Sequence, residues 1–558
     1  MQFRFFKIMA LCHVLIASSA CAQNAVKSNS LKNQDNRPNI IVVMVDDMGY
    51  SDLGCYGGEI NTPNLDALAA SGMMMNNFYN DARCCPTRAS LLTGQYQHKV
   101  GVGEFGTSLS KNCVTIAEAL QQNGYSTAMV GKWHLSQATP MEDKTKHLQW
   151  VNREYNPDTL YADLDTYPAK RGFEKYYGVI WGVVNYFNPF SLVEGVKTVT
   201  DKLPADYYTT HAFTDKAIDY VNEYKKDKAP FFMYLAYNAP HWPVQAPAET
   251  IKKYEKTYLG GWDSLRRARY DRMVEKKLID KKTYPYIPEE TNVLKWNALS
   301  PSEKLNFSKR MATHAAMVDE VDKGVGKLVA QLKKNGQFEH TIIFFMSDNG
   351  ASPELVKVPG YDRPSALSDG TPLQYGYPEY DKIGSAVSYT GIGNGWANAL
   401  NTPYRYWKAE SYNGGAKTPM FMVGPGISKG ISHTVAHVMD IMPTCLELSK
   451  TNYPKTYKGN QITSIDGHSL VPIMAGKKVE NYKDLFFEHE DGKALISGGY
   501  KLVSLRKGKW ALYNLAKDQT ETLNIIDQQP AIAKEMIAKW ENWAKELGVG
   551  NHEGFKHD

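Results

Sequence analysis

The sequence is poor in cysteine, with seven in 558 residues. Two of them, Cys12 and Cys21, lie in the N-terminal leader. The others are too few and too scattered for a disulfide scaffold, and no Cys-x-x-Cys or Cys/His spacing suggests a zinc site. They are Cys55, Cys84, Cys85, Cys113 and Cys445. The adjacent pair, Cys84 and Cys85, therefore requires a local explanation.

The sequence also lacks a strong excess of charge of either sign. Its formal net charge is only +5, and no long run of Lys and Arg occurs. A nucleic-acid ligand is therefore not expected. No low-complexity block stands out, so the composition is that of a globular protein. The length exceeds what one core usually serves, which predicts one large domain and a smaller one.

The first 22 residues have the pattern of a signal peptide. Arg4 and Lys7 form a basic start, residues 8–17 are apolar, and small residues follow at 18–22. The apolar run is too short to span a bilayer. We predict that this leader exports the protein.

Two cleavage sites compete at the end of the leader. One follows Ala22, and the other precedes Cys21, which would then carry a lipid anchor. Ser18 stands where a lipoprotein usually has leucine. The polar residues 23–37 would form a tether. Both alternatives predict an exported protein, located in the periplasm or as an outer-membrane lipoprotein of a bacterium.

Acidic and amide side chains follow two predicted strands. Residues 38–45 are apolar and β-branched and lead to Asp46 and Asp47, and residues 341–346 lead to Asp348 and Asn349. The carboxyl ends of parallel strands meet at the crevice where open α/β sheets bind ligands. Solvated strand ends are the alternative, but two successive acids repel each other unless a cation lies between them. This oxygen-only set predicts a Ca²⁺ site, with Mg²⁺ less favoured.

Basic side chains follow two further predicted strands. Residues 126–130 lead to Lys132 and His134, and residues 230–237 lead to His241. A single histidine is more often structural than catalytic. Lys132 and His134, however, alternate along the chain, so both can enter the same crevice.

The alternation of strands and helices predicts an α/β fold. We expect a large mixed, mostly parallel sheet flanked by helices over residues 38–455. Short strands and a closing helix predict a smaller α+β domain over residues 456–550, with an antiparallel sheet, and a tail at 551–558. The basic segment 265–279 is expected to be a solvated helix without a chemical role.

The stretch at residues 84–88, Cys-Cys-Pro-Thr-Arg, has two interpretations. The cysteines can be small buried hydrophobic residues. Alternatively, Cys84 lies just before a helix N-terminus, where backbone N–H groups favour negative charge. Arg88 would then supply a fork of donors for a tetrahedral oxyanion such as sulfate or phosphate.

These motifs together resemble the type I sulfatases of the alkaline phosphatase superfamily. The shared motifs are Asp-Asp-Met-Gly after a strand, Thr-Pro-Asn-Leu-Asp, Cys-x-Pro-Thr-Arg with Leu-Leu-Thr-Gly, Gly-Lys-Trp-His, Ala-Pro-His-Trp-Pro, Ser-Asp-Asn-Gly and the stretch at 401–408. They occur in the family's order and cover nearly the whole chain after the leader. Residues 260–266 look most like bacterial arylsulfatases. The resemblance implies the sulfatase fold in addition to the α/β class.

The resemblance implies that a maturase oxidises Cys84 to formylglycine. Cys84, Pro86 and Arg88 match the family's modification signature, whereas Cys85 occupies its variable position. In the family, the hydrated aldehyde attacks sulfur, the alcohol leaves, and a formylglycine-sulfate intermediate then expels sulfate. The implied calcium ligands are Asp46, Asp47, the modified Cys84, Asp348 and Asn349.

The resemblance also implies roles for the basic residues. Arg88 binds the diol and the sulfate oxygens together with the metal, and Lys132 orients the diol. His134 assists removal of its proton, and Asp348 is a second possible acceptor. His241 and Lys408 bind the ester and assist the leaving oxygen, with His241 the favoured proton donor. One position departs from the family pattern, because Asn413 stands where an acid usually precedes Gly-Gly.

We expect residues 351–400, rich in Gly, Tyr, Ser and Pro, to shape the substrate pocket with residues 149–190. Tyr and Trp there could stack on a sugar or aryl ring. The favoured function is an exported, calcium-dependent sulfuric ester hydrolase acting on a sulfated glycan or an aryl sulfate. The alternatives are a formylglycine-dependent phosphodiester or phosphonate monoester hydrolase and, from another class, a glycan-binding surface lipoprotein without catalysis.

Overall fold

The computed structural model describes residues 37–104, 106–154, 160–227, 229–287, 290, 292–360, 363–480 and 482–549. The predicted leader, residues 23–36 of the tether and the tail at 551–558 lie outside these ranges. Within them, no helix has the length and apolarity needed to cross a bilayer.

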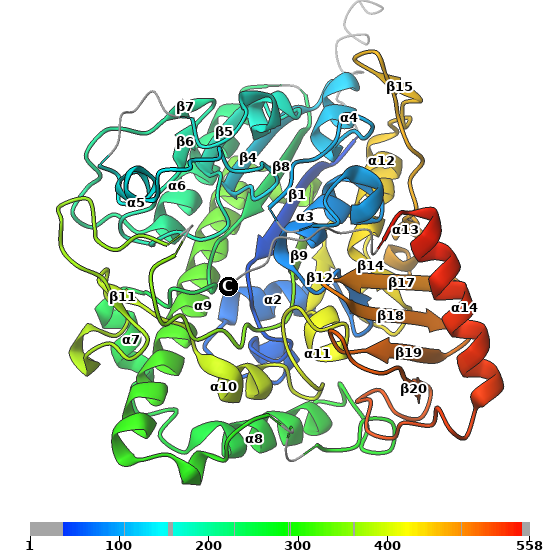
Figure 1. Cartoon of the computed structure of the whole chain (residues 1–558). Helices are drawn as coiled ribbons and strands as arrows, with labels where there is room; N and C mark the ends of the chain where they lie inside the picture. The colour runs from blue at the N-terminus through cyan, green and yellow to red at the C-terminus, as the bar shows by residue number, and fades with distance from the viewer. Residues whose placement is uncertain are drawn as a thin grey trace, which may run out of the picture.

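A ten-stranded mixed sheet forms the centre of the molecule (Figure 1). In spatial order its strands are β13 (Gly430–Ser432), β2 (Met73–Met75), β12 (Met420–Val423), β9 (Thr341–Ser347), β1 (Asn39–Val45), β8 (Phe231–Ala236), β4 (Ser126–Lys132), β5 (Lys175–Val179), β6 (Leu192–Glu194) and β7 (Lys197–Thr198). Strands β9, β1, β8, β4 and β5 are all parallel. Antiparallel pairs join β12 to its neighbours and β6 to β5 and β7. The predicted α/β class and mixed sheet are confirmed.

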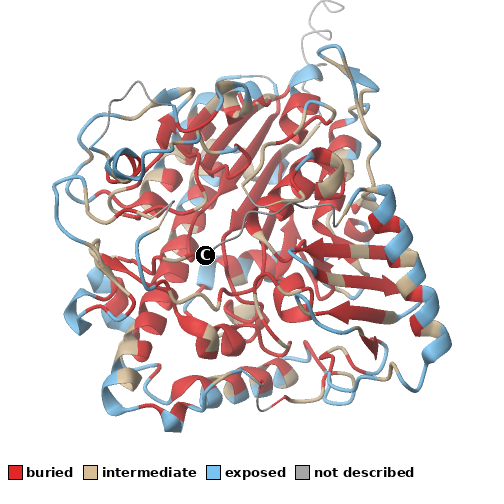
Figure 2. Cartoon of the chain, in the orientation of Figure 1, coloured by how far each residue is buried: buried red, intermediate tan, exposed pale blue. Residues whose placement is uncertain are grey.

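Strand β1 is buried on both faces, which explains its continuous apolar sequence. Successive side chains of a strand point to opposite faces. Ile41, Val43 and Val45 belong to the core on one side of the sheet, whereas Val42 and Met44 belong to the core on the other. Figure 2 shows the central strands as buried. The site at the end of β1 therefore rests on a strand fixed from both sides.

Helices cover both faces of this sheet. On one side lie α2 (Pro63–Ser71), α6 (Thr209–Tyr224), α8 (Gly261–Glu275), α9 (Pro301–Asn335) and α10 (Gly393–Leu400), and on the other α3 (Cys84–Thr93), α4 (Ile116–Gln122) and α12 (Ile441–Ser449). Four shorter helices complete the larger part: α5 (Lys144–Val151), α7 (Ala248–Tyr254), α11 (Asn413–Ala416) and α13 (Val471–Met474). Three two-stranded sheets also occur, and they pair β3 (Phe78–Tyr79) with β14 (Ala436–His437), β10 (Gln374–Tyr375) with β11 (Ser388–Tyr389), and β15 (Thr456–Tyr457) with β16 (Asn460–Gln461).

The C-terminal part forms a second, antiparallel sheet. It contains β17 (Asp484–His489), β18 (Gly492–Ser497), β19 (Tyr500–Ser504) and β20 (Ala511–Asn514), with α14 (Pro530–Glu546) packed along it (Figure 1). Tyr79 and Tyr412, from the larger part of the chain, also pack in the core of this sheet. Conversely, Ile473 lies in the core of the large sheet. The α+β prediction is confirmed, and the boundary between 455 and 456 stays a prediction.

The prediction for segment 265–279 is wrong in one respect, because the helix found there is not fully solvated. Arg266 and Arg269 on α8 are buried. The guanidinium of Arg269 donates to Asp52 Oδ1 at 2.7 Å and to Glu59 Oε1 at 2.8 Å. A basic helix sequence cannot reveal carboxylates that lie about 210 positions earlier in the chain.

We expect Arg269→Met to lower the stability of the protein by about 3–5 kcal/mol, because it leaves the buried carboxylate of Asp52 without its arginine partner. Chemical denaturation of Arg269→Met and Arg267→Met would check this. Arg267 lies on the same helix and pairs with Asp271 at the surface. Its replacement should therefore leave the denaturant midpoint of unfolding at the wild-type value. Equal midpoints for both variants would contradict the role given to Arg269.

Candidate active site

The predicted site residues converge where the carboxyl ends of four adjacent parallel strands meet. Strands β9, β1, β8 and β4 are consecutive neighbours in the sheet. Asp46 and Asp47 follow β1, Asp348 and Asn349 follow β9, His241 follows β8, and Lys132 ends β4, with His134 two residues later. All seven side chains are buried. The sheet topology therefore brings together residues from widely separated parts of the chain.

Three carboxylates and one amide face one another at this edge. The Asn349 amide donates to Asp47 Oδ1 at 2.7 Å, and the Asp47 N–H donates to Asp348 Oδ1 at 3.2 Å. Burial and the neighbouring Asp46 raise the pKa of Asp348 to about 7. Among the described residues, Asp46 Oδ1 and Asn349 Oδ1 are buried without a hydrogen-bond partner. Hard oxygens that lack hydrogen-bond partners and lie among close carboxylates fit a cation such as Ca²⁺.

Three cationic side chains are interleaved with these carboxylates. Arg88 Nη2 donates to Asp348 Oδ2 at 2.7 Å, and Lys132 Nζ donates to Asp46 Oδ2 at 2.5 Å. Lys408 Nζ lies 2.8 Å from Asp47 Oδ1. Burial alone would lower the pKa of Lys408, but the nearby carboxylates outweigh it and raise that pKa. The carboxylates therefore keep Lys408 in its charged form.

The two cysteines have different surroundings. Helix α3 begins at Cys84 itself, rather than just after it as predicted, and Arg83 is its extended N-cap. Burial raises the pKa of the Cys84 thiol, whereas the charges of Lys132 and Lys408 act to lower it. Cys85 instead packs in the apolar core beneath the sheet. Thus Cys84 faces the charged site, and the small-hydrophobe interpretation fits Cys85.

Both site histidines are neutral at pH 7. Burial lowers the pKa of His241 to about 4. Its Nε2 accepts from Lys408 Nζ at 3.0 Å, and its Nδ1 donates to the Trp242 carbonyl at 2.5 Å. Burial, followed by Lys132, holds the pKa of His134 well below its usual value. A Cβ at Gly182 would lie 2.4 Å from the His134 ring, so only glycine permits this approach.

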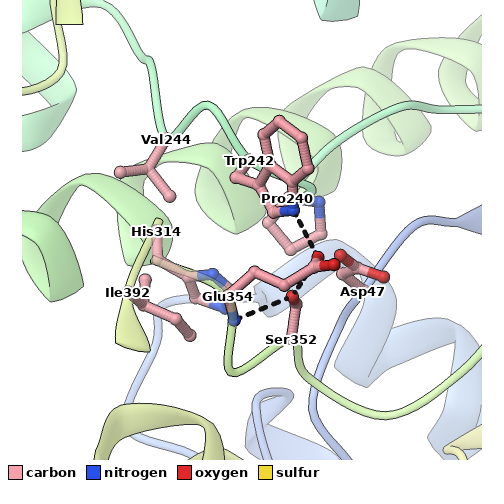
Figure 3. A pocket seen from close by; sticks show the side chains of 8 residues that line it. All are labelled: Asp47, Pro240, Trp242, Val244, His314, Ser352, Glu354 and Ile392. Atoms are coloured by element: carbon pink, nitrogen blue, oxygen red, sulfur yellow. Dashed lines mark hydrogen bonds between the residues drawn. The ribbon is translucent and has the colours of Figure 1, made fainter. Parts of the chain in front are cut away.

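The structure adds residues that the sequence patterns did not single out. A small hollow beside the site is lined by Asp47, Pro240, Trp242, Val244, His314, Ser352, Glu354 and Ile392 (Figure 3). Three of them come from residues 351–400, as expected for that segment. Glu354 is acidic and lies in a loop whose composition indicated only a pocket wall, so no sequence signal identified it.

A further network holds the loop after β1. Asp52 Oδ2 accepts from the Gly49 N–H at 2.9 Å and lies 2.9 Å from His314 Nε2 on α9. Together with Arg269, these contacts tie two helices to the turn that carries Asp46 and Asp47. No local sequence pattern indicates this network, because its members come from distant parts of the chain.

Asn413, which stands where the family pattern usually has an acid, contacts the carboxylate of Glu521. Glu521 Oε2 accepts from the Asn413 backbone N–H at 2.8 Å, and Glu521 Oε1 lies 2.7 Å from Lys501 Nζ on β19. Lys501 Nζ also donates to the Asn413 side-chain carbonyl at 2.7 Å. The smaller part of the chain therefore supplies a carboxylate close to the position where the family usually has an acid.

Glu521→Gln should destabilise the protein by about 3–5 kcal/mol, since it leaves the buried Lys501 charge unpaired. The double variant Lys501→Met/Glu521→Met should recover most of this loss because it removes both charges. Thermal unfolding of wild type, single and double variants would check the expectation. A double variant less stable than the single one would contradict it.

Comparison with known proteins agrees with this geometry. The family model described as Sulfatase matches residues 38–451. The chain belongs to the sulfatase family. It is 31% identical over 469 residues to an arylsulfatase of Klebsiella aerogenes, covering 80% of this chain and 93% of that protein. It is 30% identical to an uncharacterized sulfatase of Schizosaccharomyces pombe, covering 92% and 95% of the two chains.

Solved sulfatase-like structures share the fold. The crystal structure of Ps i-CgsB in complex with k-i-k-neocarrahexaose superposes with a TM-score of 0.62 at 25% identity and covers 91% of this chain and 93% of that one. The resemblance to sulfatases of the alkaline phosphatase superfamily is thus confirmed, and the protein is a sulfuric ester hydrolase of the sulfatase family.

Proposed function

We propose that the protein is an exported, calcium-dependent sulfatase that cleaves the S–O bond of a sulfated glycan or an aryl sulfate with a formylglycine derived from Cys84. The observation that carries this proposal is the charge balance around Cys84. Arg88, Lys132 and Lys408 match the carboxylates of Asp46, Asp47 and Asp348. A divalent cation added to this set leaves a net positive site, which attracts a sulfate ester.

Asp46, Asp47, Asp348 and Asn349 would hold the calcium ion, and residue 84 would complete the set. When present, the ion would supply positive charge for the sulfate oxygens, and the hydrated aldehyde would supply the attacking oxygen. Arg88 holds Asp348 in place with one arm of its guanidinium. Lys132 fixes Asp46 in the same way.

The remaining side chains handle protons and bind the ester. The neutral ring of His134 can accept a proton from the hydroxyl of residue 84. His241 is also neutral, and its Nε2 accepts from Lys408. We therefore infer that the hydrogen-bonded pair of Lys408 and His241 protonates the leaving oxygen and that the proton comes from the Lys408 ammonium. The sequence-based assignment also used both residues, but it favoured His241 as the proton donor.

Two relatives support the substrate classes. The arylsulfatase of Klebsiella aerogenes supports an aryl sulfate, and the structure solved with k-i-k-neocarrahexaose supports a glycan. A screen of defined sulfated mono- and disaccharides beside an aryl sulfate would test the proposal, with released sulfate as the readout. Faster turnover of a phosphodiester at equal concentration would favour the phosphodiester or phosphonate alternative. Binding without turnover, in protein that carries the aldehyde, would favour the non-catalytic lipoprotein.

Export and maturation complete the proposal. The basic and apolar leader supports transport to the periplasm, with anchoring at Cys21 as one alternative. A formylglycine-generating maturase would act on Cys84. Cell fractionation of wild type and Cys21→Ala tests the anchor: a shift from the membrane to the soluble fraction supports it, and an unchanged distribution argues for cleavage after Ala22.

A further inference from the structure

Glu354 is an acidic side chain at the entrance to a site that attracts anions. Its carboxylate Oε2 lies 3.9 Å from Lys408 Nζ, and its Oε1 lies 3.6 Å from Arg83 Nη1. One third of the Glu354 side chain remains exposed, whereas Lys408 is buried. The carboxylate therefore stands between solvent and the lysine expected to bind the sulfate ester.

The position of this carboxylate is fixed. Oε2 accepts from the Trp242 indole N–H at 2.5 Å and from the Ser352 hydroxyl at 2.8 Å (Figure 3). The second oxygen, Oε1, accepts no hydrogen bond within the described residues and forms an ion pair with Arg83. Oε1 can thus accept a hydrogen bond from a ligand hydroxyl, whereas a ligand anion there would be repelled.

An aromatic cluster adjoins the Glu354 carboxylate through the Trp242 indole. Trp242 is half-buried and follows His241 directly, with ring centroids 4.9 Å apart. Behind it, the Tyr389 ring lies 6.2 Å from Trp242 and 4.9 Å from Tyr375. Ile392 and Val244 line the same hollow (Figure 3). Val244, Ile392 and Tyr389 are buried, whereas Trp242 is partly exposed. A sugar or aryl ring attached to a sulfate near Lys408 and His241 would therefore meet the Trp242 side chain.

We propose that Trp242 and Glu354 form the subsite for the leaving group and that Glu354 selects an uncharged ring. In this subsite a hydroxyl next to the sulfate ester donates to Glu354 Oε1. A second sulfate or a carboxylate at that place is rejected by like charge. The inference rests on the proposed sulfatase reaction and makes Glu354 a specificity-determining residue, beyond the residues that act on the sulfate itself.

The test uses two aryl sulfates that differ only by a carboxylate on the ring carbon next to the ester. Both are assayed with wild type and Glu354→Gln, and the ratio of their kcat/KM values is compared. We expect wild type to favour the uncharged substrate and Glu354→Gln to lower this ratio about tenfold, since one close like charge is removed. Any change in Lys408 caused by the variant affects both substrates and cancels in the ratio. Glu194→Gln, an exposed carboxylate on β6, is the matched control and should leave the ratio unchanged.

A second measurement repeats the comparison at high ionic strength. Salt should narrow the difference in this ratio between wild type and Glu354→Gln, because it screens the partly exposed carboxylate. A ratio that is the same in wild type and Glu354→Gln would overturn the inference while leaving the sulfatase reaction intact. Failure of wild type to hydrolyse any sulfate ester would instead refute the proposed function.

Discussion

Cys84→Ala is expected to reduce sulfate ester hydrolysis by about four orders of magnitude or more, as loss of a nucleophile does in enzymes that use one. Cys84 is the first residue of α3, and the charges of Lys132 and Lys408 act on it. An alanine there cannot be converted to the aldehyde. The measurement is kcat/KM for an aryl sulfate, with protein expressed together with a maturase.

Cys85→Ser is the matched control for this variant. Cys85 lies in the apolar core, where burial raises the pKa of its thiol. The variant should therefore retain activity within about threefold while costing about 1–3 kcal/mol of stability for the buried hydroxyl. If Cys84→Ala kept full activity while Cys85→Ser lost it, the assignment of the modification to Cys84 and not to Cys85 would be wrong.

Asp348→Asn is expected to reduce kcat/KM by about 10³-fold and to abolish the thermal stabilisation by calcium. The variant removes one carboxylate from the proposed metal set and the partner of Arg88. In wild type, calcium at 100 times its dissociation constant should add about 2.7 kcal/mol of stability. Thermal unfolding of chelator-treated protein, with and without added Ca²⁺, measures this directly.

Asp219→Asn provides the control, because Asp219 is an exposed acid on α6, away from the strand ends that carry the site. It should retain both activity and the calcium shift. Chelation should lower the activity of wild type, and Ca²⁺ should restore it better than Mg²⁺, as a set of carboxylate and amide oxygens favours the larger ion. An Asp348→Asn variant with a wild-type calcium shift would contradict the assigned ligand set.

Most of the site could be predicted from the sequence because its residues follow strands. Once β1, β4, β8 and β9 are read as parallel, their following residues must share one edge, which places Asp46, Lys132, His241 and Asp348 together. The order of the motifs added Cys84 and Lys408, whose placement depends on loops and not on strand ends.

The residues that were missed share a different physical origin. Glu354 meets Lys408, Arg269 meets Asp52, and Glu521 meets Asn413 only through tertiary packing. Charge or composition in a local window does not encode these pairings. The same limit explains why α8 was expected to be solvated although two of its arginines are buried.

The most direct test of the account is mass spectrometry of the peptide at residues 84–88 in preparations with different degrees of maturation, combined with their sulfatase activity. Cleavage after Arg83 and Arg88 releases this peptide alone. Specific activity should rise in proportion to the fraction of chains that carry the aldehyde at residue 84 and should extrapolate to zero at zero conversion. Full activity in protein whose Cys84 is entirely unmodified would contradict the account.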